Sequence, residues 1–222
     1  MNDLEVVAYL RAHPDFLIRN PEPIEFLEVP HGCGEAISLI EYQAGALRRQ
    51  SHDLRLRMRD LVAAARANET LGRQVHDLTL ALFECHAIDE VLARVYQAMK
   101  DDFKVDMTAL SLFSEPRLPG DRALSEFADR QGSHHELFAK SLRDGEPLCG
   151  RLPQAQAVAL FAERAGSVGS GALLPLGGAR LMGVLAICAH DPKRYYPGMG
   201  TIFLRRIAQV VTCAITPYLA LE

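Results

Sequence analysis

A long stretch of the chain repeats its apolar positions with the period of a helix that pairs with another helix. Between Gly34 and Cys85 there is no proline, and strong helix formers dominate. Large residues recur at every seventh position, as Ile40, Leu47, Leu54 and Leu61, with Asn68, Val75 and Leu82 continuing the row. The companion row holds smaller residues, namely Ile37, Ala44, Ser51, Met58, Ala65 and Gly72. Such a seam is typical of a coiled coil, so we predict one long helix that pairs with a second copy of the chain.

The seam leaves its orientation open. Small residues on one row let backbones approach closely, so an antiparallel or four-helix arrangement fits as well as a parallel pair. The charges at Arg48, Arg55 and Arg57 lack matching acids one heptad away and do not decide between them. In the alternative hypothesis, the long helix packs on the N-terminal part of its own chain, where prolines divide residues 3–30 into two or three short helices. We favour self-association because of the length of the seam.

The rest of the chain mixes helical and strand patterns. Amphipathic stretches predict helices at 88–103, 134–143, 153–162 and 199–215. Strand formers and apolar runs predict strands at 105–113, 167–176 and 179–190, the last two forming a hairpin around Gly177 and Gly178. The polar stretch 114–131 predicts a loop with one short strand. This order predicts an α+β fold, in which helices flank an antiparallel sheet.

The hairpin resembles that of the GAF group of sensory domains. In that fold two adjacent central strands carry a pattern that reads here as GALLPL (171–176) and GVLAI (183–187). The resemblance implies two parts: residues 1–72 form an all-α N-terminal arm with a long coiled-coil-type helix, and residues 73–222 form a GAF-like domain. GAF domains bind very different small molecules or none, so the fold alone does not name a ligand or cofactor.

Short motifs along nearly the whole chain resemble the domain-of-unknown-function 484 family of bacteria. They are HPDF (13–16), PHG (30–32), SLIEYQ (38–43), ARANE (65–69), CGRL (149–152) and MGT (199–201). Their order, with the GAF-like hairpin between the last two, makes the resemblance specific. It implies a GAF-like C-terminal domain and a regulatory protein, without an established activity or ligand.

Composition excludes several other classes of protein. The 222 residues have a formal net charge of −4, which disfavours nucleic acid as a partner. No apolar run is long enough to cross a membrane, and the N-terminal segment has acids where a signal peptide would have bases. Five cysteines lie scattered without a CxxC pair, as in a reduced compartment. We therefore expect a cytoplasmic protein.

The residues that could support catalysis or metal binding do not form a convincing set. Adjacent His134 and His135 point about 100° apart on a helix, so they do not converge on one ion, and we expect no metal. Cys149 precedes Gly150 and Arg151 in a loop, and the nearby Arg151 could lower the pKa of the thiol. This leaves open a thiol-dependent GAF-fold reductase of a small sulfoxide. The sequence instead favours a non-catalytic regulatory dimer that binds a small molecule or a protein partner, and a scaffold without a ligand is a further alternative.

A ligand, if one binds, is expected under the loop segment beside the sheet. There we predict a pocket lined by Phe113, Cys149, Arg151 and Ser170, with Arg151 fixing an anionic group. In the alternative, Arg151 lies on the surface, and Phe161 and Leu160 fill the pocket.

Overall fold

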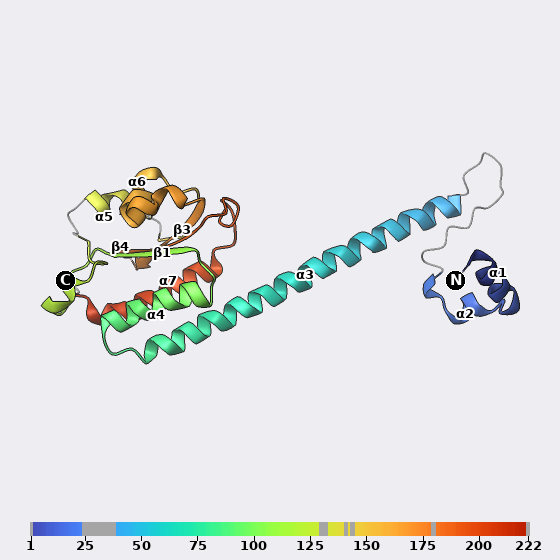
Figure 1. Cartoon of the computed structure of the whole chain (residues 1–222), viewed down its shortest axis with the longest axis horizontal. Helices are drawn as coiled ribbons and strands as arrows, with labels where there is room; N and C mark the ends of the chain where they lie inside the picture. The colour runs from blue at the N-terminus through green and yellow to red at the C-terminus, as the bar shows by residue number, and fades with distance from the viewer. Residues whose placement is uncertain are drawn as a thin grey trace. The chain divides into compact units, whose positions relative to one another are not determined.

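The computed structural model describes residues 2–23, 39–128, 133–139, 142, 145–178 and 181–220 (Figure 1). The chain divides into two compact units, residues 1–65 and 66–222, and the boundary predicted from the sequence, after residue 72, stays a prediction. In the first unit, helix α1 covers Asp3–Ala12 and helix α2 covers Phe16–Arg19, as the prolines of this region predict. A capping box begins α1, in which the backbone N–H of Asn2 donates to Glu5 Oε2 at 2.9 Å.

Helix α3 runs from Leu39 to Phe83 and confirms the long helix predicted from the heptad pattern. The boundary between the two units falls within this helix. Its last turns belong to the second unit, because Val75, Leu78 and Leu82 are buried in the core there. The prediction that Val75 and Leu82 continue a seam between two chains is therefore wrong: these two side chains pack within their own chain.

The second unit is built around a four-stranded antiparallel sheet with the order β1-β4-β3-β2. The strands are β1 (Met107–Leu112), β2 (Leu148–Gly150), β3 (Ser170–Gly177) and β4 (Leu181–Ala189). The β3–β4 hairpin confirms the predicted pair of core strands, whereas the short edge strand β2 was not predicted. At Gly183 a Cβ would lie 2.6 Å from the carbonyl oxygen of Ser111, so only glycine allows β1 and β4 to approach this closely.

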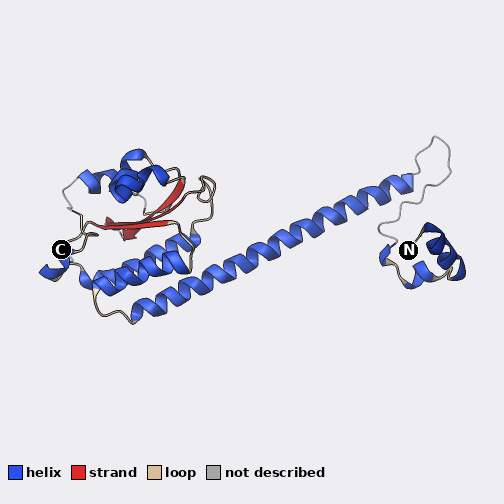
Figure 2. Cartoon of the chain, in the orientation of Figure 1, coloured by secondary structure: helices blue, strands red, loops and turns tan. Residues whose placement is uncertain are grey.

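Helices cover both faces of the sheet (Figure 2). Helix α4 (Ile88–Asp101), helix α7 (Ile202–Ile215) and the end of α3 pack on one face, with Leu110 of β1 and Leu174 and Leu176 of β3. Helices α5 (Ser133–Ala139) and α6 (Gln154–Phe161) pack on the other face. Three short 3-10 helices, η2 (Pro119–Ala123), η3 (Ala162–Ser167) and η4 (Thr216–Tyr218), complete the described elements. The α+β class predicted from the sequence is thus observed, with a helical layer on each side of the sheet.

Candidate functional site

Phe113, the first of the predicted ligand-binding residues, is part of a packed core. Its side chain is 1% exposed and belongs to the cluster between the sheet and helices α5 and α6. Its ring stacks on Phe138 with centroids 6.1 Å apart and meets the edge of His135 at 5.3 Å. Phe161 and Leu160, named above as the side chains that would fill a pocket, pack in the same cluster.

Ser170 lies on the opposite face of the sheet from Phe113. It pairs with Ala189, which belongs to the core under α4 and α7, and it is 1% exposed. Its hydroxyl donates to the carbonyl oxygen of Asp191 at 2.6 Å and accepts from the backbone N–H of Tyr195 at 3.1 Å. The hydroxyl thus holds the loop that follows β4, and both of these bonds are made within the fold.

Cys149 and Arg151 lie at the edge of the sheet. Cys149 is half-buried in β2 opposite Ala172 and packs against the core on the α4 and α7 face, while Arg151 is exposed. The structure therefore does not bring the four predicted residues around one pocket: Phe113 lies on one sheet face, and Ser170 and Cys149 lie on the other.

The surroundings of Cys85, Cys149 and Cys188 raise the pKa of each thiol and so do not make it a better nucleophile. Burial raises the pKa of Cys149, and it raises the pKa of Cys188 to about 12. Burial, with the nearby Glu90 carboxylate, also raises the pKa of Cys85. Since the thiolate is the nucleophile, each of these shifts lowers the reactive fraction at neutral pH. Among the described residues, no three histidine, cysteine or acidic side chains are grouped so that they could hold a metal ion.

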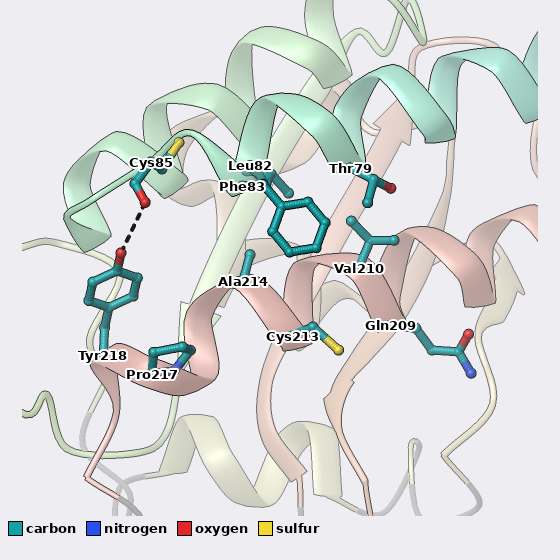
Figure 3. A pocket seen from close by; sticks show the side chains of 10 residues that line it. All are labelled: Thr79, Leu82, Phe83, Cys85, Gln209, Val210, Cys213, Ala214, Pro217 and Tyr218. Atoms are coloured by element: carbon teal, nitrogen blue, oxygen red, sulfur yellow. Dashed lines mark hydrogen bonds between the residues drawn. The ribbon is translucent and has the colours of Figure 1, made fainter.

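A groove of about 400 Å³ lies on the second unit between the end of α3 and α7 (Figure 3). Its walls are mostly apolar, and its lining comes from both helices and from the turns that follow each of them. The lining residues are Thr79, Leu82, Phe83, Cys85, Gln209, Val210, Cys213, Ala214, Pro217 and Tyr218. Phe83 is 81% exposed at this site, although it is among the largest apolar side chains of the unit.

Three polar side chains of the groove donate hydrogen bonds to backbone within the chain. The hydroxyl of Thr79 donates to the carbonyl oxygen of Val75 at 2.7 Å, and the thiol of Cys85 donates to that of Ala81 at 3.4 Å. The hydroxyl of Tyr218 donates to the carbonyl oxygen of Cys85 at 3.3 Å, which joins η4 to the end of α3 (Figure 3). Because these groups already have acceptors, the groove presents chiefly apolar surface to an incoming molecule.

The seam predicted on α3 lies in the first unit as an exposed apolar row. Leu47, Leu54 and Leu61 of this row, and Met58 of the companion row, are between 56 and 71% exposed. Ile40 lies within α3, but its side chain is outside the described residues. The structure thus leaves these four side chains largely in contact with solvent. Residues 24–30, which belong to the N-terminal segment of the alternative hypothesis, lie outside the described residues.

Sequence reasoning missed the groove, although α7 carries a sign of it. The apolar side chains of α7 spread over more of the helix surface than the face that packs on the core. Leu204, Ile207 and Val211 are buried in the core. Ile202 is exposed and Val210 is half-buried. An apolar arc wider than the core contact is a sign of a second packing surface.

In the described part of the chain, no helix is both long and apolar enough to cross a membrane.

Comparison with known proteins places the chain in one family. An uncharacterized protein YigA from Salmonella typhimurium is 31% identical over 209 residues, which are 94% of this chain and 88% of that protein. Proteins of the same name from Shigella flexneri and Escherichia coli are each 30% identical, with the same coverage of both chains. The family model described as "Protein of unknown function, DUF484" matches residues 1–220, and the chain belongs to this family.

Proposed function

We propose that this protein is a non-catalytic regulatory protein that works as a homodimer, with the α3 seam as its pairing surface. One observation supports this most directly: large apolar side chains at heptad spacing stay exposed along α3. Fully burying a side chain of this size contributes about 1.5–3 kcal/mol. Leu47, Leu54, Met58 and Leu61 of each copy would contribute together, against an association cost of about 4–15 kcal/mol. The burial of these eight side chains is of the same order as this cost, so the seam is large enough to support pairing.

The proposed regulatory role draws on the second unit. An antiparallel sheet with a central β3–β4 hairpin and helices on both faces is the arrangement expected of a GAF-like sensory domain. The packing of Phe113, Phe138 and Phe161 on the α5 and α6 face favours a protein partner over a small ligand at this face. The raised pKa values of Cys149 and Cys188 count against a thiol-dependent reductase.

Light scattering coupled to size exclusion, at micromolar protein concentration, tests the dimer. We expect a mass of twice the 24.5 kDa of one chain, and a monomer at this concentration would contradict the proposal. Replacing both Leu47 and Leu54 with lysine should give monomers, since each charge would be buried in the seam without a partner. Val158→Lys, on the exposed surface of α6, is the matched control and should remain dimeric.

A further inference from the structure

We infer that the groove between α3 and α7 is a docking surface for the same groove of a second copy of this chain, with the two α3 helices running parallel. This inference rests on the proposed dimer and extends it from the seam of the first unit to the second unit. It also assigns a role to Phe83, which neither the fold nor the seam explains.

The surface has the form that self-association requires. A two-fold interface brings the same patch of both copies together, so a protruding side chain must lie beside a hollow that accepts it. Here the exposed ring of Phe83 borders a groove whose far wall is formed by Val210, Cys213 and Ala214 of α7. Figure 3 shows the Phe83 ring between these two helices, near Val210 and Ala214 of α7. In a symmetric pair each ring enters the space between α3 and α7 of the other copy, so four helices pack together.

The chemistry of the groove suits an apolar partner. Thr79, Cys85 and Tyr218 donate their hydrogen bonds to backbone carbonyl groups of the same chain, and the remaining wall is largely apolar. A polar small molecule would find few groups to bind here, whereas an aromatic ring loses only its contact with water. An exposed phenylalanine is such a ring, and each copy supplies one.

The sequence spacing along α3 supports a second copy as the occupant. Thr79 stands in the same seven-residue row as Ser51, Met58, Ala65 and Gly72, so the companion row of the seam reaches the groove. A Cβ added at Gly72 would meet no atom within 4 Å, so the structure of the single chain leaves open space at this point of the row. A close approach of a second α3 helix would use that space.

The charges beside the seam are compatible with parallel helices. In a parallel coiled coil, the residue directly before a companion-row residue lies beside the seam. It faces the residue of the second helix whose number is five higher. This places Gln43 opposite the partner's Arg48, and Gln50 opposite the partner's Arg55. It also places Arg57 opposite the partner's Val62, and Ala64 opposite the partner's Glu69. No two like charges meet in these four pairs. Only this orientation brings the two grooves face to face, because the groove lies at one end of α3.

Sedimentation over a dilution series tests the role of the groove. Phe83→Ala should raise the dimer dissociation constant at least a hundredfold, because two buried rings are lost and each contributes a factor of about ten or more. Cys213→Arg, which places a charge in the groove wall, should raise it at least as much. Val158→Lys is the control and should leave it unchanged, and circular dichroism should show the same helix content in all three variants.

Disulfide mapping tests the parallel orientation. Ser51→Cys and Ala65→Cys are made separately in the full chain, which is oxidised and digested, and the linked peptides are identified by mass spectrometry. In parallel helices each new cysteine links to its own equivalent in the second copy. In antiparallel helices at most one of the two positions can do so, and that result would overturn the parallel arrangement.

The outcomes separate this inference from the proposed function. If the wild-type protein is dimeric and the Leu47→Lys, Leu54→Lys variant is monomeric, but Phe83→Ala and Cys213→Arg dimerise like the wild type, the groove is not part of the interface and the seam dimer stands. If the wild-type protein is monomeric, both the inference and the proposed dimer are wrong. If Phe83→Ala and Cys213→Arg weaken the dimer and both cysteine variants link to their equivalents, the docking surface is supported.

Discussion

Ser170→Ala separates a structural role of this hydroxyl from the ligand-binding role that the sequence suggested. The hydroxyl is the acceptor for the backbone N–H of Tyr195 and the donor to the carbonyl oxygen of Asp191. Alanine keeps the Cβ and removes only the oxygen, so the substitution adds no atom to the core. The backbone N–H of Tyr195 and the carbonyl oxygen of Asp191 then lose the serine hydroxyl as a hydrogen-bond partner.

The size of the effect follows from burial. Ser170 is 1% exposed and Tyr195 is also buried, so water does not readily replace the lost hydroxyl at the N–H of Tyr195. Leaving a buried donor without a partner costs about 1–3 kcal/mol. The carbonyl of Asp191, an exposed residue, can bind water and should add little. We therefore expect the free energy of unfolding to fall by about 2 kcal/mol.

Urea unfolding followed by circular dichroism at a fixed protein concentration measures this change. Ser125→Ala is the control, because its hydroxyl makes an exposed bond with the neighbouring Glu126 carboxylate, and it should change the free energy of unfolding by less than about 0.5 kcal/mol. If Ser170→Ala unfolds at the same urea concentration as the wild type, with an unchanged slope, the loop does not depend on this hydroxyl.

Three further predictions follow from the same structure. Burial raises the pKa of Cys188 to about 12, so at pH 8 this thiol should react with a disulfide reagent far more slowly in the folded protein than in urea. Equal rates would contradict the burial. Burial, and then the Glu126 carboxylate 3.2 Å from the hydroxyl, raise the pKa of Tyr96 to about 12. Glu126→Gln should therefore move the titration of Tyr96, followed by ultraviolet absorbance, to lower pH. Glu115→Gln is the control. With free methionine sulfoxide and a thiol reductant, the purified protein should show no turnover; sustained reduction that is abolished by Cys149→Ser would favour the reductase alternative.

Periodicity predicted the regular elements because each depends on residues close in sequence. The α3 helix follows from its helix formers and heptads, and the β3–β4 hairpin follows from two apolar runs around Gly177 and Gly178. The strand β2 has only the three residues Leu148–Gly150, too few for an alternating pattern to show. Its place in the sheet depends on pairing with β3, which is distant in sequence.

The sequence could not show whether the four predicted ligand-binding residues share one pocket, because that depends on the register between strands. Alternation within β1 correctly separates the two faces of that strand, but it does not say which residues of β3 share each face. The observed pairs Ala109–Ala186 and Leu173–Ala186 place Leu173, and not Ser170, on the face of Phe113. The groove was missed for a similar reason. It forms where α7 packs beside the end of α3, and the apolar pattern of either helix alone does not show that the two helices meet.

The burial of Val75, Leu78 and Leu82 has an evolutionary consequence. A gene fragment that begins at α4 would encode the whole sheet but would lack three side chains of its core, and the apolar surfaces that these cover would face water. Recombination can therefore move the sheet unit between genes only together with the last turns of α3. Whatever helix is joined upstream must continue those turns without insertion or deletion, because each added residue rotates the helix by about 100°. The heptad phase of the arm is thus inherited with the sheet unit.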